Sequence, residues 1–259
     1  MVAFRTNSAY DRFWEGRKQL SSIEDSITNA IRIFQLSIHP KNEQERLDRA
    51  QAMKNLVAMA YSIKYYLLAK PNYFSEKMKG LVSPKILEIG GVDSSSPLDE
   101  KKWKISDNEM RSRGIFTKDS LNLPITLAFE ITNYLEYIDR SYIVPTVYLA
   151  MYNSVNIITN AFVGCIRIQT TPIPHAYNSH LHMICTLYLL SIPFSLNGEA
   201  LVTFLVVQFI VTFMLLGVLS IAEEIENPFG SDKNDLPISA YCDNLYEHLT
   251  FVLSNEKEL

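Results

Sequence analysis

The sequence has no excess of basic residues that would favour binding to nucleic acid. Its 259 residues include 24 Lys and Arg against 28 Asp and Glu, which gives a formal net charge of -4. Because affinity for nucleic acid comes largely from cations placed on phosphates, this balance gives no electrostatic support for such a role. A nucleophile with its base, or a pair of carboxylates, is also missing at any recognisable catalytic spacing. We therefore expect neither a nucleic-acid partner nor an enzymatic activity.

Cysteine is scarce as well. The three thiols, Cys165, Cys185 and Cys242, lack the close spacing of metal-ligand pairs, and one would remain after any single disulfide. Two of them lie in apolar surroundings, where a thiol behaves as a small apolar side chain. The pattern favours packed free thiols over a disulfide or a metal site.

Charge is absent from two long stretches. Residues 168–198 and 200–222 contain no Asp, Glu, Lys or Arg. The second run is long enough as a helix to cross the hydrocarbon of a bilayer. The first is interrupted by Pro172, Pro174 and Pro193 and predicts one span over residues 177–196. With Asn197 and Gly198 as the turn, the two spans form a hairpin whose ends face the same compartment.

Outside these runs the pattern is that of soluble helices. The chain is 47% hydrophobic and 20% charged, so we expect one part in the membrane and one in water. Apolar residues at helical spacing predict further helices over residues 4–39, 42–70, 123–138, 145–165 and 238–253. Residues 72–116 show only short pieces of pattern, and 90–97 form a loop by composition. The fold class is therefore all-α.

A short acidic segment follows the second apolar run. We call residues 222–237, AEEIENPFGSDKNDLP, the acidic elbow, because carboxylates crowd around a Pro-Phe-Gly break that a helix cannot cross unkinked. One interpretation is helix capping: Asp232 or Asp235 accepts hydrogen bonds from free amides of the last helix, with Pro237 in its first turn. Hard oxygen atoms at this spacing also suit calcium, which accepts six to eight oxygen ligands.

Three segments together resemble the signatures of the bestrophin family of ion channels. They are FRTNSAYDRFWEGRK at 4–18, GCIRIQTTPIPHAY at 164–177, and the acidic elbow. The resemblance covers nearly the whole chain and is nearer the bacterial and fungal members. It implies one channel domain over 1–259, with mainly cytosolic helices in 1–168, a membrane hairpin in 177–222, and the elbow with a cytosolic helix in 223–259. It also implies a homopentamer around a central pore.

The resemblance assigns roles to single residues. It implies that Phe4 forms an apolar ring in the pore neck and that Thr146 lies at a cytosolic aperture. In calcium-gated animal members the elbow holds calcium, and the matching oxygen ligands here are Glu224, Asn227, Asp232 and Asp235. Lys233 and Asn234 interrupt the acidic run, which weakens the case for calcium. Polar and charged residues in the first motif are expected to form a structural network, not a filter: Asn7, Tyr10, Asp11, Arg12, Trp14, Glu15 and Arg17.

The resemblance predicts an integral, multi-pass subunit that conducts chloride and other monovalent anions. Arg167 beside the first span places the soluble part in the cytosol by the positive-inside rule, and we expect the plasma membrane. The chain starts within the first motif, so we expect the family's first span and most of its pore-lining helix to lie outside this sequence. Two alternatives remain: a cation-selective relative, and a truncated subunit that does not conduct. Calcium is the one cofactor that the pattern suggests.

Overall fold

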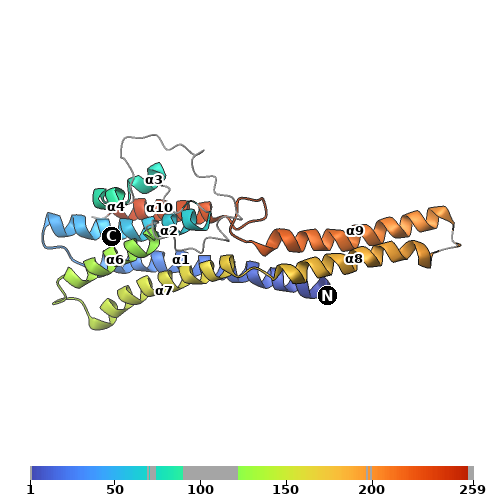
Figure 1. Cartoon of the computed structure of the whole chain (residues 1–259). Coiled ribbons are helices and arrows are strands. Elements are labelled where there is room, and N and C mark those ends of the chain that lie inside the picture. The colour runs from blue at the N-terminus through green and yellow to red at the C-terminus, as the bar shows by residue number, and fades with distance from the viewer. Residues whose placement is uncertain are drawn as a thin grey trace. The chain divides into compact units, whose positions relative to one another are not determined.

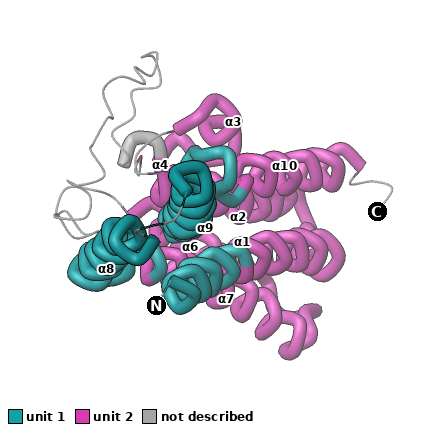
Figure 2. The backbone as a smooth tube through the Cα atoms, turned by 90° about the vertical axis from the view of Figure 1, so that its right-hand side faces the viewer, with its two compact units in different colours: residues 1–17, 168–236 teal, residues 18–167, 237–259 magenta. Residues whose placement is uncertain are grey.

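The computed structural model describes residues 2–68, 70, 74–89, 122–196, 198 and 200–255. Within these ranges every regular element is a helix, which confirms the predicted all-α class. The described residues fall into two compact units (Figure 2). Unit 1 comprises residues 1–17 and 168–236, and unit 2 comprises residues 18–167 and 237–259. The predicted loop at 90–97, and most of the stretch 72–116, lie outside the described residues.

Unit 2 is a helical bundle with α2 (Glu43–Leu67) in its interior. Helices α6 (Leu123–Tyr137) and α10 (Ile238–Ser254) both pack on α2, and Figure 1 shows them beside it. From residue 52 to residue 67 only Lys54 and Lys64 escape burial. The amphipathic pattern predicted a helix with one apolar side, but its second half is covered all round, as expected for a central helix.

The remaining helices of unit 2 are α3 (Glu76–Lys79), α4 (Pro84–Ile89), α7 (Pro145–Thr170) up to Arg167, and α1 (Val2–Ser37) from Lys18 onward. Arg49, which is buried, donates hydrogen bonds to the backbone carbonyls of Gln35 at 3.1 Å and Ile38 at 2.7 Å. Carbonyl groups at the end of a helix lack an intrahelical partner. Arg49 of α2 therefore closes the end of α1.

Asp243 of α10 joins three helices of unit 2. One of its carboxylate oxygens accepts hydrogen bonds from the Tyr61 hydroxyl at 2.8 Å and from the Lys77 ammonium at 2.7 Å. Tyr61 lies on α2 and is buried, and Lys77 lies on α3. These bonds, first that from Lys77 and then that from Tyr61, hold the pKa of Asp243 below its ordinary value.

Acidification is expected to weaken this joint. Because the pKa of Asp243 is lower in the folded protein, its stabilisation is complete above the ordinary aspartate pKa of about 4 and is lost as the pH falls below it. Asp243→Ala should cost about 1–3 kcal/mol at neutral pH, since the buried Tyr61 hydroxyl loses its acceptor. Unfolding of Asp243→Ala, Tyr61→Phe and the double variant in denaturant measures the interaction energy between Asp243 and Tyr61. If the free-energy costs of the two single variants simply add in the double variant, the two side chains do not stabilise the fold through their hydrogen bond.

Unit 1 contains a pair of antiparallel helices, α8 (His175–Ser195) and α9 (Leu201–Glu226), which pack side by side (Figure 1). Leu181, Cys185 and Leu219 form a small core, against which Val2 and Tyr177 pack. At the turn Gly198 has φ of 102°, a left-handed conformation that glycine adopts without strain. The predicted hairpin is therefore present as two helices with the predicted glycine in the turn.

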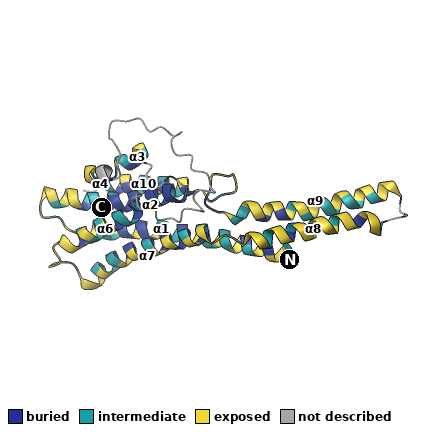
Figure 3. Cartoon of the chain, viewed as in Figure 1, coloured by how far each residue is buried: buried dark blue, intermediate teal, exposed yellow. Residues whose placement is uncertain are grey.

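The two helices of this hairpin differ in how apolar they are. Among the described helices, α7 and α9 are long and apolar enough to cross a membrane, and α8 is not among them. The polar side chains in the first half of α8, such as His175, Asn178 and His182, explain the difference. The most apolar stretch of α7 is 44% buried, which is typical of a core helix, whereas only 6% of that of α9 is buried. Figure 3 shows how exposed α9 is.

The cysteine prediction is confirmed. Cys165, Cys185 and Cys242 are all buried and free. Burial raises the pKa of Cys242 to about 12, so this thiol stays protonated and inert at neutral pH.

Candidate functional site

The candidate site lies within unit 1, where the first turns of α1, the start of α8, the end of α9 and the acidic elbow come together. Its centre is Arg5, whose side chain has no exposed surface. The guanidinium donates hydrogen bonds to Asn178 Oδ1 at 2.5 Å and to Glu226 Oε2 at 3.4 Å. It also forms an ion pair with Glu223 Oε1 at 3.6 Å. Two carboxylates from α9 thus surround one buried cation.

Arg12, two turns further along α1, binds backbone instead of carboxylates. It donates to the carbonyl oxygens of Ile168 at 2.7 Å, Thr171 at 2.5 Å and Glu226 at 3.1 Å. The first two carbonyls lie at the end of α7 and just beyond it, and the third closes α9. A helix C-terminus carries partial negative charge, so a cation there is favourable. Arg12 is structural, as predicted for the first motif.

Glu226 connects Arg5 and Arg12 to the short segment with Pro172 and Pro174 that links α7 to α8. Its Oε1 accepts a hydrogen bond from the backbone N–H of Ile173 at 3.1 Å, while Oε2 faces Arg5. Nearby, His182 Nε2 and Glu223 Oε1 are 2.6 Å apart. The arrangement holds α1, α8 and α9 in one register.

Phe229 anchors the acidic elbow to α1. Its side chain is 2% exposed. A methyl group added at Gly16 would lie 3.0 Å from Pro228 Cγ and 3.1 Å from Phe229 Cζ. The Pro-Phe-Gly break therefore packs directly on the backbone of α1, and only glycine fits at position 16 without a shift.

The elbow is closed by its own aspartates. Asp235 Oδ2 accepts a hydrogen bond from the backbone N–H of Asp232 at 2.6 Å, and the Asp235 N–H donates back to the Asp232 carbonyl at 3.1 Å. The Asp235 carboxylate also lies against Gly230, where a side chain would collide with it. Burial, together with the negative charges of Asp232 and Glu224, raises the pKa of Asp235 despite this N–H bond.

Helix capping by the elbow, one of the two interpretations of these carboxylates, is wrong. The residue before α10 is Pro237, which makes no side-chain cap, and it precedes the helix instead of lying in its first turn. Asp235 is already used within the elbow. The helix-start pattern could not distinguish an aspartate that closes a loop from one that caps the helix three residues later.

The four residues matched to a calcium site divide into smaller groups. Glu224 accepts a hydrogen bond from Asn234 at 2.8 Å, and Asp232 is joined to Asp235. Asn227 is the residue that ends α9. In the described ranges no three His, Cys, Asp or Glu side chains are grouped closely enough to hold a metal ion. Asp232 and Asp235, the two carboxylates expected to be the metal ligands of this set, therefore have no third such side chain grouped with them among the described residues.

The two residues matched to pore constrictions are both exposed. Phe4 is 64% exposed in the first turn of α1, with its ring edge-on to Tyr177 at a centroid distance of 6.1 Å. Thr146 is exposed in the first turn of α7, in unit 2.

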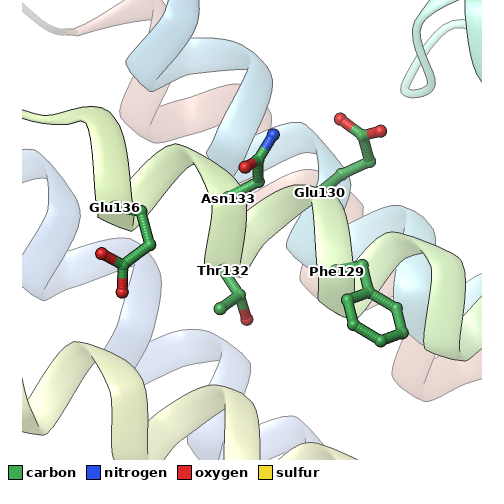
Figure 4. A pocket seen from close by; sticks show the side chains of 5 residues that line it. All are labelled: Phe129, Glu130, Thr132, Asn133 and Glu136. Atoms are coloured by element: carbon green, nitrogen blue, oxygen red, sulfur yellow. The ribbon is translucent and has the colours of Figure 1, made fainter.

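Two open recesses border the α6–α7 turn in unit 2. One is lined by α6 side chains, which Figure 4 shows on successive turns of the helix: Phe129, Glu130, Thr132, Asn133 and Glu136. The second shares Glu136 and extends along α7 through Leu149, Asn153 and Asn156. Glu136 is bound by the Tyr152 hydroxyl and by Arg140, at 2.5 Å for Arg140, and these bonds lower its pKa. Both recesses are shallow and lack catalytic geometry.

The most buried polar group of the site was missed from sequence. Arg5 lies in the first motif segment, Glu226 lies in the acidic elbow, and Asn178 directly follows the second segment, but nothing in the sequence says that they meet. A charged residue just outside a predicted span is costly to leave unpaired, and that signal could have flagged Arg5 and Glu226 as partners.

Comparison with known proteins gives consistent matches. Residues 1–250 match the sequence model of a family described as Bacterial/Fungal Bestrophin protein. The chain is 32% identical over 251 residues to a protein of Synechocystis sp. strain PCC 6803 named a voltage-dependent anion channel-forming protein, covering 96% of this chain and 72% of that one. A protein of the same name from Nostoc sp. strain PCC 7120 is 32% identical over 254 residues, with the same coverage.

Solved structures match as well. A bacterial bestrophin homologue from Klebsiella pneumoniae superposes with a TM-score of 0.75, covering 98% of this chain and 82% of that one at 23% identity. At this identity the likeness concerns the fold alone. It agrees with the helical architecture described above.

Proposed function

Because this chain belongs to the bacterial and fungal bestrophin family, we propose that it forms an anion channel in a membrane. The observation that carries the proposal is the match, over 96% of this chain, to two relatives that are both named voltage-dependent anion channel-forming proteins. The conducted ions are chloride and other monovalent anions.

The functional unit is a homopentamer around a central pore. This assembly is carried over from the resemblance of the three motif segments to the family. The exposed positions of Phe4 and Thr146 leave both side chains available to form rings around an axis. In this arrangement Phe4 belongs to the neck and Thr146 to the cytosolic aperture.

Helices α8 and α9 form the membrane hairpin. More than half of the surface of several large apolar side chains of α9 is exposed, as expected for lipid contact: Leu201, Val202, Leu205, Phe209 and Phe213. Unit 2 lies on the cytosolic side, with the turn at Gly198 on the opposite side. The plasma membrane is the proposed location.

Recordings in planar bilayers test the channel directly. In a chloride gradient the reconstituted protein should give currents that reverse near the chloride potential. Phe4→Ala should weaken closure or shift selectivity, because a dry apolar ring is lost from the neck. Phe251→Ala, on α10 of unit 2, serves as the control. Reversal near the sodium potential would favour a cation channel, and a protein without current would favour a non-conducting subunit.

Calcium regulation through the elbow is a separate proposal, supported by the hard oxygen atoms of Glu224, Asn227, Asp232 and Asp235. A bound ion would stabilise the protein by mass action, so the melting temperature should rise with calcium relative to chelator. Asp232→Ala combined with Asp235→Ala should abolish the rise. A wild-type melt that is indifferent to calcium at concentrations well above micromolar would rule out a tight clasp. A calcium-dependent melt that the double variant loses would establish the clasp.

A further inference from the structure

Helix α8 continues through a proline. Pro193 lies inside the helix, which ends at Ser195. Proline has no backbone N–H, so the carbonyl oxygen four residues earlier, that of Leu189, cannot receive its regular intrahelical hydrogen bond. Beyond this point the Leu196 N–H still donates to the Ile192 carbonyl at 3.1 Å. The proline therefore leaves one particular carbonyl, that of Leu189, without its backbone donor.

A side chain of α9 donates to that carbonyl. Gln208 Nε2 forms a hydrogen bond with the Leu189 carbonyl oxygen at 3.3 Å. The same amide group donates to Thr212 Oγ1, one turn further along α9, also at 3.3 Å. Gln208 is the only Asn or Gln in residues 200–222. The single carboxamide of this apolar run thus meets the carbonyl that Pro193 deprives of its donor.

The contact lies well inside the apolar part of the hairpin. Helix α9 begins at Leu201, so Gln208 is about 10 Å along it at the helical rise. The neighbouring side chains of Leu205 and Phe209 are more than half exposed, as expected for contact with lipid. A carbonyl without a donor is costly at this depth, because lipid chains offer no hydrogen bonds.

Gln208 is itself only partly satisfied. Its Oε1 atom is buried and has no hydrogen-bond partner among the described residues. A carboxamide with one unpaired end is unfavourable in apolar surroundings. Apolar packing alone therefore does not explain a glutamine at this position, and the bond from Nε2 to the Leu189 carbonyl gives the side chain a specific role.

We propose that Gln208 is a positioning residue whose side-chain amide replaces the N–H that Pro193 lacks and thereby fixes the register of α8 against α9. The proposal rests on the membrane hairpin proposed above, since in water the Leu189 carbonyl would be hydrated. It follows that the Gln208 side chain becomes dispensable once residue 193 regains an N–H group.

Melting temperatures in detergent test this dependence. Gln208→Leu should lower the melting temperature by about 2–4 °C, the shift expected when one hydrogen bond is lost from a protein of this size. Pro193→Ala restores the N–H, so in that background the same Gln208→Leu change should lower it by less than about 1 °C. Thr212→Val, which removes the other partner of Gln208 Nε2, is the matched control, and its effect should not depend on residue 193.

The comparison of the two backgrounds decides the proposal. An equal loss in both would overturn it, because Gln208 would then stabilise the protein through another contact. An unchanged melting temperature of Gln208→Leu with Pro193 in place would overturn it as well. If Gln208→Leu does not fold at all, the double variant with Pro193→Ala should recover the fold, and a double variant that also fails to fold would contradict the proposal.

Thiol labelling separates this proposal from that of the membrane hairpin. The native thiols are buried, so a Phe209→Cys variant, at a 70% exposed position of α9, reports on the surroundings at this depth. In lipid vesicles the introduced thiol should resist a charged thiol reagent. If it reacts, the membrane hairpin fails and the role of Gln208 with it. If it resists while Gln208→Leu leaves the melting temperature unchanged, the role of Gln208 alone fails.

Discussion

Arg5→Ala is expected to lower the free energy of unfolding by about 3–5 kcal/mol. Arg5 is fully buried, and its partner Glu226 is only 16% exposed, with Glu223 half exposed beside it. Removing the cation leaves carboxylates close together without a counter-charge, so the cost includes the desolvation of the groups that remain. Chemical unfolding in detergent, followed by tryptophan fluorescence, measures the change, since Trp14 lies in the same unit.

The matched control is Arg140→Ala. Arg140 also pairs with a carboxylate, at 2.5 Å from Glu136, but both side chains are about half exposed. Exposed pairs contribute about 0–1 kcal/mol, so the control should change stability little. Arg5→Ala combined with Glu226→Gln should recover part of the loss, because one uncompensated charge is removed as well. Equal costs for Arg5→Ala and Arg140→Ala would show that burial of Arg5 is not what matters.

Phe229→Ala is expected to cost about 3–5 kcal/mol, the usual range for truncating a buried phenylalanine. The ring is 2% exposed and contacts the backbone of α1 at Gly16. Its loss leaves a cavity under the acidic elbow that the Pro-Phe-Gly backbone cannot easily fill. Thermal unfolding of the purified protein measures the effect, and Phe251→Ala, at a 58% exposed position on α10, should stay within about 0.5 kcal/mol.

Overpacking the same contact should also destabilise the protein. Gly16→Val adds three carbon atoms at a position where even a single methyl group would lie 3.0 Å from Pro228. Such insertions cost about 1–3 kcal/mol of stability. In the combined Gly16→Val and Phe229→Ala variant the new side chain can occupy part of the cavity. The double variant should therefore lose less than the sum of the single losses. Strict additivity would mean that the two residues do not share one packed interface.

Helix positions were predictable from sequence because their signals are local. The second helix was expected over residues 42–70, and α2 begins at Glu43, directly after Asn42, whose side chain caps the helix by accepting a hydrogen bond from the Glu45 N–H at 2.8 Å. The helix predicted over residues 123–138 likewise begins at Leu123, as α6. The order of the motifs also predicted the family correctly, since three specific segments in sequence are hard to produce by chance.

The interactions within the site were harder to predict because they depend on distant residues. Arg5 and Glu226 are 221 positions apart, and no periodicity relates them. The capping interpretation of Asp235 failed for a different reason: its carboxylate accepts a hydrogen bond from the backbone N–H of Asp232, inside a turn whose shape the pattern does not reveal. The roles proposed for Phe4 and Thr146 would require neighbouring subunits around an axis, and the contacts within one chain leave both side chains exposed.

The unequal apolarity of α8 and α9 affects how the protein enters the membrane during synthesis. Helix α8 leaves the ribosome first, but its histidines and Asn178 make its independent transfer into lipid unfavourable. Helix α9 follows after a short turn and is apolar enough to partition alone. We therefore expect α8 to stay at the translocon until α9 has been synthesised, and the two helices to insert together as one hairpin. The order of translation is thus opposite to the order of membrane affinity.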